Sequence, residues 1–348
     1  MNIKSLLLGS AAALVAVTGA RAADAVVVAE PEPVEYVKVC DAYGAGFYYI
    51  PGTDTCLKIS GYVRADVKGG DLWEFHPITA VDEDGEPTDF GDTYDFHTRA
   101  TLRFDARSET ELGTLKSYIE ARLDYQNSVQ SQTLAHGYIE LGGFRVGVTD
   151  SRFDAWTGGG PVIEDGIVPY AGGRTNQISY TFAAGNGFSA IISLEQGDSS
   201  HLIVDYAPHV VAGAKFEQEW GSISAVGGYD SVVEEFAGKL RADVKFNDTI
   251  SAFIMAGYQS DPDKPNYYGA WLGDWAVWGG GSAKVAENAT VNGQVSYSDA
   301  GALAASLNVD YEIVPGFVIT PEIDYLKVDA DDGDDDAFGG IVRFQRNF

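Results

Sequence analysis

Charged side chains alternate with apolar or small ones along residues 96–107, which read Phe-His-Thr-Arg-Ala-Thr-Leu-Arg-Phe-Asp-Ala-Arg. Successive side chains of a strand point to opposite faces, so Arg99, Arg103 and Arg107 share one face. Two kinds of protein contain such strands. In a soluble sandwich the apolar face forms the core. In an outer-membrane barrel the apolar face meets lipid, and the arginines line a water-filled lumen where charge sets ion preference.

Catalysis would need a nucleophile, a base and an orienting group within reach of one another. No histidine lies in a Gly-x-Ser-x-Gly or His-Glu-x-x-His motif; the histidines are His76, His97, His136, His201 and His209. A chance meeting of His136 with Ser131 is the weak remaining possibility. We therefore predict a protein that is not an enzyme, with a barrel lipase or protease as a minor alternative.

Residues 1–22 have the pattern of a secretory signal peptide. Lys4 supplies the positive region, an apolar stretch follows, and Ala20-Arg21-Ala22 is a small-x-small cleavage site. The apolar run is shorter than the roughly 20 residues that a membrane-spanning helix needs. Cleavage would remove Lys4 and Arg21 and change the formal net charge from −28 to −30. We expect an exported protein.

The chain has two cysteines, Cys40 and Cys56. In an oxidising compartment a disulfide is the expected state, and it would contribute roughly 3 kcal/mol in the loop-entropy model. Glu30-Pro31-Glu32-Pro33 precedes the pair as a stiff lead-in. We predict that residues 23–56 form a separate disulfide-stapled segment, a periplasmic arm or plug, ahead of a domain over residues 57–348.

Acidic residues gather in two runs, residues 82–95 and 329–336. A chain of net charge −28 does not suit nucleic acid as a partner. The second run does not fit the EF-hand template, because Val328 and Ala330 would occupy two ligand positions. We predict no cofactor and no dedicated metal site, and leave open diffuse binding of divalent cations by these acidic loops.

Alternating runs separated by turns continue from Leu57 to the end of the chain. Short turns such as Gly142-Gly143 and Pro315-Gly316 alternate with longer polar loops. There are about 16 runs, and their lengths are near the ~9–11 residues that a membrane strand needs. The runs are 57–67, 96–107, 114–124, 134–141, 144–151, 176–182, 188–195, 209–219, 222–230, 235–246, 250–260, 273–285, 289–299, 303–313, 317–328 and 337–348. A soluble sandwich of this size would normally divide into domains. Aromatic residues, 12% of the chain, lie near many run ends, as in interfacial girdles. We predict an all-β, 16-stranded antiparallel transmembrane barrel.

Four segments resemble one known family. Residues 41–64, Asp-Ala-Tyr-Gly-Ala-Gly-Phe-Tyr-Tyr-Ile-Pro-Gly-Thr-Asp-Thr-Cys-Leu-Lys-Ile-Ser-Gly-Tyr-Val-Arg, are similar to the N-terminal signature of the general porins of alphaproteobacteria. Residues 142–147 (Gly-Gly-Phe-Arg-Val-Gly), residues 152–156 (Arg-Phe-Asp-Ala-Trp) and the ending at 344–348 resemble the same family. The resemblance implies a trimeric diffusion porin in the bacterial outer membrane, whose third outer loop folds inward and narrows the pore. Small hydrophilic solutes, outer-membrane lipid and lipopolysaccharide are the partners that this implies.

The inward loop of the family corresponds to residues 150–175, which follow the fifth expected strand. Its acidic residues Asp154, Glu164 and Asp165 would face a basic wall across the opening. Strand parity puts the wall arginines on the lumen side, and we predict that the constriction uses Arg64, Arg99, Arg103 and Arg122. The resulting transverse field would filter solutes by charge as well as size. A substrate-specific sugar or anion channel and an adhesin are the alternatives.

Overall fold

The computed structural model describes residues 38–73, 94–330 and 333–348. The predicted signal peptide lies outside the described residues, as do residues 82–93 of the first acidic run and residues 331–332 of the second. Among the helices that are described, none is both long and apolar enough to cross a membrane.

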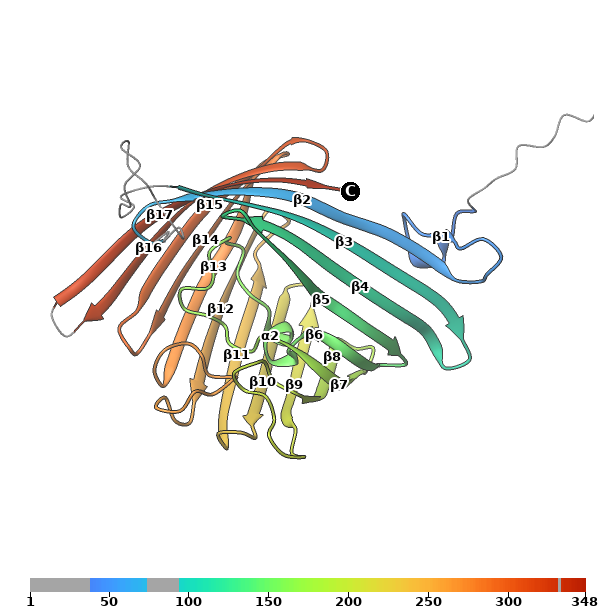
Figure 1. The fold of residues 1–348 in the computed structure, drawn as a ribbon, viewed down its shortest axis with the longest axis horizontal. Helices are drawn as coiled ribbons and strands as arrows, with labels where there is room; N and C mark the ends of the chain where they lie inside the picture. Colours follow the sequence, from blue (N-terminus) through green and yellow to red (C-terminus); the bar gives the residue numbers. More distant parts are fainter. Residues whose placement is uncertain (1–37, 74–93, 331–332) are drawn as a thin grey trace, which may run out of the picture. The chain divides into compact units, whose positions relative to one another are not determined.

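Sixteen antiparallel strands, β2 to β17, form one closed sheet (Figure 1). Each strand pairs with its neighbours in the chain, and β17 closes the barrel by pairing with β2. The predicted fold is therefore confirmed. The strands are β2 (Cys56–Gly69), β3 (Tyr94–Thr110), β4 (Gly113–Gln126), β5 (Val129–Leu141), β6 (Phe144–Asp150), β7 (Arg174–Ala183), β8 (Phe188–Glu195), β9 (His209–Gln218), β10 (Gly221–Asp230), β11 (Glu235–Lys245), β12 (Ile250–Gln259), β13 (Trp275–Ala286), β14 (Ala289–Ser298), β15 (Leu303–Val314), β16 (Phe317–Ala330) and β17 (Gly333–Asn347).

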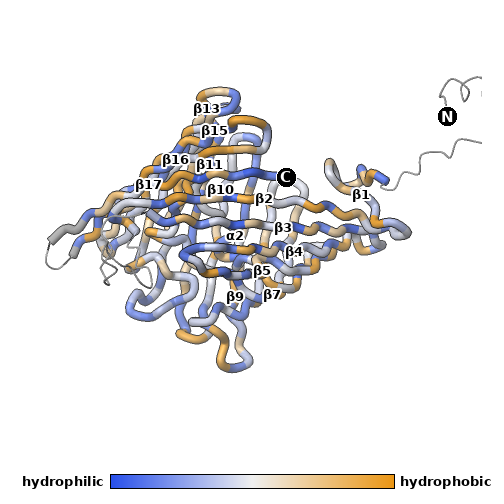
Figure 2. The backbone as a smooth tube through the Cα atoms, turned by 45° about the horizontal axis from the view of Figure 1, so that its top comes forward, coloured by the Kyte–Doolittle hydropathy of each residue, from blue (hydrophilic) through white to orange (hydrophobic). Residues whose placement is uncertain are grey.

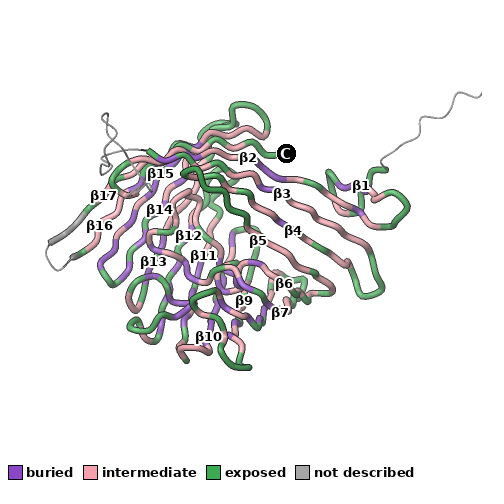
Figure 3. The backbone as a smooth tube through the Cα atoms, in the orientation of Figure 1, coloured by how far each residue is buried: buried purple, intermediate pink, exposed green. Residues whose placement is uncertain are grey.

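Hydropathy and burial both alternate along many of the strands (Figures 2 and 3), and large apolar side chains are among the exposed ones. Ile254 and Ile323 are each 65% exposed, whereas Asp66 and Glu120 are buried. This reverses the arrangement of a soluble protein, in which charged side chains are rarely buried unless they are paired. A closed sheet with an apolar outer face and a polar inner face suits a barrel surrounded by lipid.

Strand β5 begins five residues earlier than the sequence pattern predicts. Asn127 and Ser128 both have positive φ and form a two-residue turn that joins β4 to β5, as type I′ hairpins do. The pairing then shifts between Glu120 and Ala121, so Ala135 is an extra residue in β5. The missed residues 129–133 read Val-Gln-Ser-Gln-Thr and give no apolar repeat, and the bulge at Ala135 then changes which residues share a face.

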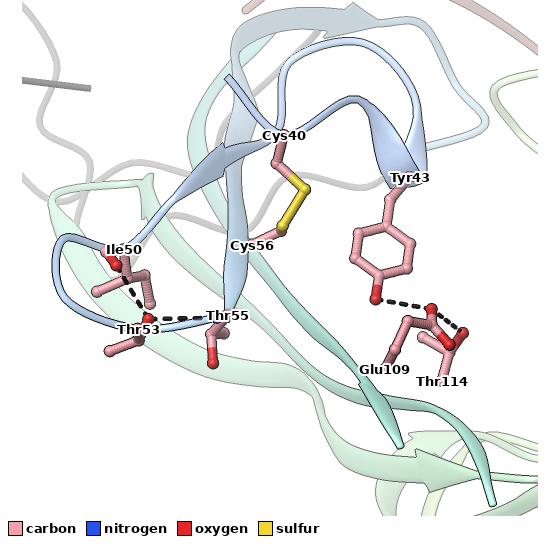
Figure 4. Close-up of a disulfide and its surroundings, with 8 residues drawn as sticks. All are labelled: Cys40, Tyr43, Ile50, Thr53, Thr55, Cys56, Glu109 and Thr114. Carbon is pink, nitrogen blue, oxygen red and sulfur yellow. Dashed lines mark hydrogen bonds between the residues drawn. A yellow bond between two sulfur atoms is a disulfide. The ribbon is translucent and has the colours of Figure 1, made fainter. Parts of the chain in front are cut away.

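The stapled segment sits at the start of β2. A disulfide joins Cys40 to Cys56 with their Cα atoms 6.0 Å apart (Figure 4), which confirms the predicted bond. The Tyr43 hydroxyl donates to Glu109 Oε1 of β3 at 2.8 Å. Strand β1 (Tyr48–Tyr49) pairs with the first two residues of β2. The disulfide, this pairing and the Tyr43 hydrogen bond fix the described part of the segment, from residue 39, to the end of the β2–β3 hairpin.

Candidate functional site

The four predicted wall arginines lie on adjacent strands, and each has a carboxylate partner. Arg99 Nε donates to Asp124 Oδ1 at 2.5 Å, and Arg103 Nε donates to Glu120 Oε2 at 2.7 Å. Arg122 Nε donates to the other oxygen of Glu120 at 2.7 Å. The fourth predicted arginine, Arg64, shares an acid with Arg343 of β17. Arg64 Nε lies 3.4 Å from Asp66 Oδ2, and Arg343 Nε lies 2.7 Å from Asp66 Oδ1.

This wall is therefore a network of ion pairs and not a row of isolated cations. Sequence reasoning named the arginines but overlooked Asp66, Glu120 and Asp124. The sequence pattern could have identified these acids. Each lies two residues from an arginine on its own strand or directly opposite an arginine on the next strand, and therefore on the same face of the sheet. One carboxylate can bridge two arginines because each guanidinium group presents several N–H donors in a fixed plane.

Aromatic rings support the same wall. The guanidinium carbon of Arg103 lies 5.4 Å from the centre of the Tyr62 ring, and that of Arg145 lies 4.3 Å from the Tyr138 ring. Tyr138 stacks in turn on Tyr118 at 5.3 Å. Cation–π contacts of this kind hold long side chains in place.

Residues 151–173 join β6 to β7 and begin with a short helix, α2 (Arg152–Thr157). Ser151 caps this helix, because its Oγ accepts a hydrogen bond from the Phe153 backbone N–H at 3.1 Å. Buried Glu195 of β8 accepts from both Ser151 Oγ and the Arg152 backbone N–H, at 2.6 and 2.8 Å. The first turn of the segment is therefore bound tightly to the strands beside it.

The rest of the segment is bound to strands on a different part of the barrel. The carboxylate of Glu322 on β16 accepts from the backbone N–H groups of Ile163 and Glu164, at 2.6 and 2.7 Å. The Tyr170 hydroxyl donates to Gln294 of β14 at 2.6 Å, and Trp278 of β13 donates to the Val168 carbonyl at 2.8 Å. The segment thus leaves β6 and reaches strands β13 to β16 before it returns to β7.

Two cations of β11 hold the carbonyl groups of this segment. Buried Lys239 Nζ donates to the Tyr170 carbonyl at 2.8 Å. Arg241 donates to the Gly159 carbonyl at 2.8 Å and forms a bidentate pair with Asp243. Phe153 and Trp156 of α2 belong to a buried cluster that also contains Tyr268, Trp271 and Trp278. The contacts between the segment and these strands were not predicted, because they join residues far apart in the sequence.

The three predicted loop acids have different surroundings. Glu164 Oε2 lies 3.4 Å from Lys68 Nζ on β2, the strand that carries Arg64. Asp154 Oδ1 lies 3.9 Å from Lys239 Nζ; burial raises the pKa of Asp154 to about 6, and Lys239 limits the rise. Asp165 forms no ion pair with any described residue. Burial, and then the charge of Glu164, raise the pKa of Asp165 to about 6.

No group of three metal-ligating side chains is arranged to hold an ion within residues 38–73, 94–330 and 333–348. The geometry is instead that of a closed polar tube, with charged groups on its wall and on one anchored segment. Comparison with known proteins gives the same picture. Residues 24–342 match the sequence profile of the Porin subfamily. Porin Omp2a of Brucella melitensis biotype 1 is 48% identical to this chain, with full coverage of both chains.

The chain belongs to the porin family. Porin Omp2b of Brucella suis biovar 1 is likewise 48% identical over the full length of both chains. Among solved structures, the outer membrane channel DcaP of Acinetobacter baumannii matches 86% of this porin and 99% of its own chain, with a TM-score of 0.65 and 19% identity. Pseudomonas putida OprB gives a TM-score of 0.60 at 10% identity, over 84% and 94% of the two chains. These two likenesses concern the fold. The protein is an outer-membrane porin, a channel for passive diffusion.

Proposed function

We propose that residues 151–173 cross the lumen and narrow the channel, so that solutes pass between this segment and the arginines of β2 to β4. The observation that carries the proposal is the double hydrogen bond from the Ile163 and Glu164 N–H groups to Glu322. It fastens the middle of a segment that starts at β6 to β16, which lies six strands away around the closed barrel by the shorter route. A tethered crossing of this kind limits pore size without closing the pore.

The charges beside this opening would act as an electrostatic filter. Glu164 beside Lys68 brings the acidic segment close to the strand that carries Arg64. Arg103 and Arg122 share a single carboxylate, Glu120, so this part of the wall has a net positive charge. Opposed charges across a water-filled gap set ion preference and orient polar solutes. The preferred solutes are therefore small, hydrophilic and charged or dipolar.

Single-channel recordings of Arg103→Gln and Glu164→Gln test this filter. Removal of the arginine charge should shift the reversal potential in a salt gradient toward cation preference, and removal of the glutamate charge should shift it toward anion preference. Glu287→Gln, in the short β13–β14 turn, removes the same charge away from the segment and should leave selectivity as in the wild type. Unchanged selectivity in both test variants would refute the constriction assignment.

The porin is also proposed to assemble as a homotrimer in the membrane, surrounded elsewhere by lipid and lipopolysaccharide. Outward positions of β2 to β4 support this because several carry small side chains that permit close approach, including Ala65, Ala100 and Ala121. Native mass spectrometry of the detergent-extracted protein tests the stoichiometry. Substitution Ala100→Trp should weaken the trimer, and a wholly monomeric wild-type protein would contradict the proposal.

A further inference from the structure

A cavity of about 360 Å³ lies beside the segment, on the side of the longer loops. The segment and the loops 196–208 and 260–274 all contribute to its lining. Its charged and aromatic lining residues are Asp154, Asp165, Tyr170, Asp198, His201 and Tyr267. A cavity of this size falls at the lower end of the range for small-molecule sites. It is separate from the ion-paired arginine wall, since no arginine lines it.

The carboxylates of this cavity have less cationic compensation than those of the wall. Asp165 has no ion-pair partner among the described residues. Asp154 lies 3.9 Å from Lys239 Nζ, which is already committed to the Tyr170 carbonyl at 2.8 Å. Asp198 by contrast is satisfied, because its Oδ1 accepts from the Ser200 N–H and lies 3.0 Å from His201 Nδ1. Two half-buried carboxylates therefore remain available to a cationic ligand.

A buried hydroxyl provides an independent sign of a ligand site. Tyr267 is 3% exposed, and its hydroxyl oxygen has no hydrogen-bond partner of acceptable geometry in the described structure, although it lies beside the backbone of Gly173. Buried polar groups usually have partners, so an unsatisfied one at a cavity wall calls for an explanation. The Tyr267 ring also packs on His201 and His209, with centroids 5.6 and 5.8 Å apart.

We propose that this cavity binds small organic ammonium ions, held by the carboxylates of Asp154 and Asp165 and by the Tyr267 hydroxyl. The ammonium group supplies several N–H donors, which two carboxylates and one hydroxyl oxygen can accept. Aromatic rings beside a carboxylate favour an organic cation over a hydrated metal ion. An anionic solute would meet uncompensated carboxylates. This inference rests on the proposed path along residues 151–173, and it adds the chemical class of a solute retained there.

Planar bilayers with the purified full-length protein test the proposal, using 1,4-diaminobutane as the probe and 1,4-butanediol as its neutral counterpart. A buffer of about 0.1 M ionic strength keeps the screening length near 10 Å. The diamine should block the current saturably, and the diol should not. Asp165→Asn should raise the half-blocking concentration about tenfold, the order expected for one lost charge-assisted hydrogen bond. The control is Asp263→Asn, which removes a charge from the loop of Tyr267 outside the cavity lining and should behave as the wild type.

Tyr267→Phe provides a second variant that keeps the ring and removes only the hydroxyl. It should also raise the half-blocking concentration, and it decides the matter if Asp165→Asn forms no channels. Equal effects of the diamine and the diol on the wild type would overturn the inference. Ohmic conductance in the same recordings would still support the porin function. Block that is unchanged in both variants would place the diamine elsewhere and overturn it too. The selectivity of Arg103→Gln and Glu164→Gln reports on the constriction separately.

Discussion

Arg64 on β2 is paired directly opposite Arg99 on β3 in the register of the barrel. Like charges opposite each other in a sheet are destabilising. Asp66 and Asp124 offset this repulsion, because Arg64 Nε lies 3.4 Å from Asp66 Oδ2 and Arg99 Nε lies 2.5 Å from Asp124 Oδ1. The positive charge of this wall thus depends on acids that hold the arginines in place.

The carboxylate of Glu120 should matter for both stability and selectivity. Its two oxygens bind Arg103 and Arg122 separately, and Glu120 itself is buried. Glu120→Gln leaves two arginines beside each other without a counter-charge. We expect a loss of about 1–3 kcal/mol in the free energy of unfolding, since both guanidinium groups remain partly solvated. Urea unfolding of the refolded barrel measures the loss, and the reversal potential should shift toward anions. Wild-type stability would show that the pairs contribute little.

Loss of the Glu322 carboxylate should release the middle of the segment. Glu322→Ala removes the acceptor of the Ile163 and Glu164 N–H groups, and hydrogen bonds to a charged group contribute about 1.5–3 kcal/mol each. We expect noisier single-channel currents and faster cleavage within residues 158–168 by a nonspecific protease. Glu312→Ala, in the same β15–β16 hairpin but at its turn, is the matched control. Currents as quiet as the wild type would argue against a tether.

Cation block and cation preference should both fall as the pH drops through about 6. Burial raises the pKa of Asp154 and Asp165 to about 6, so both carboxyls are charged above that value and neutral below it. The folded state then binds more protons than the unfolded state between about pH 4 and 6, and stability contributed by these groups decreases as the pH rises through that window. Other charged groups face the pair and belong in the interpretation: Lys239, Asp150, Glu164, Glu322, Asp198 and His201.

Recordings at pH 7.5 and 5 with the diamine check this dependence. The half-blocking concentration should be higher at pH 5. In Asp165→Asn the change with pH should be smaller, because one of the two titrating groups is absent. An equal change in the variant and the wild type would assign the pH effect to another group.

Reduction of the disulfide should loosen the stapled segment without unfolding the barrel. The bond closes a sequence separation of 16 residues, for which the loop-entropy model gives about 3 kcal/mol. The double variant Cys40→Ser, Cys56→Ser should therefore be cleaved faster between residues 41 and 55, while the closed sheet keeps its strand content. Far-ultraviolet circular dichroism and limited proteolysis give the two readouts. Loss of the barrel signal would show that the staple stabilises the whole fold.

Strand parity explains how much of this protein could be read from its sequence. Alternation locates the strands, and it shows that residues such as Arg103 lie on the water-facing side of the sheet. This works because every second side chain of a strand points to the same side. It fails at the Ala135 bulge, where the repeat is broken. It also cannot say which strand a loop touches. The contact of Ile163 with Glu322 spans 159 positions, and the burial of Trp271 in a polar loop has no local pattern.

Both ends of the barrel chain meet one strand, and this bears on assembly. Strand β17 pairs with β2 from Gly69 to Tyr62, and the C-terminal Phe348 exchanges backbone hydrogen bonds with Gly61. Strand β1 pairs with Leu57 and Cys56 of β2. Since β3 pairs with the other edge of β2, β1 and β17 share one edge. If the disulfide forms before the barrel closes, the edge of β2 that remains free for β17 has a fixed length. Residues 58–60 of β2 separate the end of the β17 pairing from β1, so β1 and the disulfide limit how far the last strand could extend along this edge.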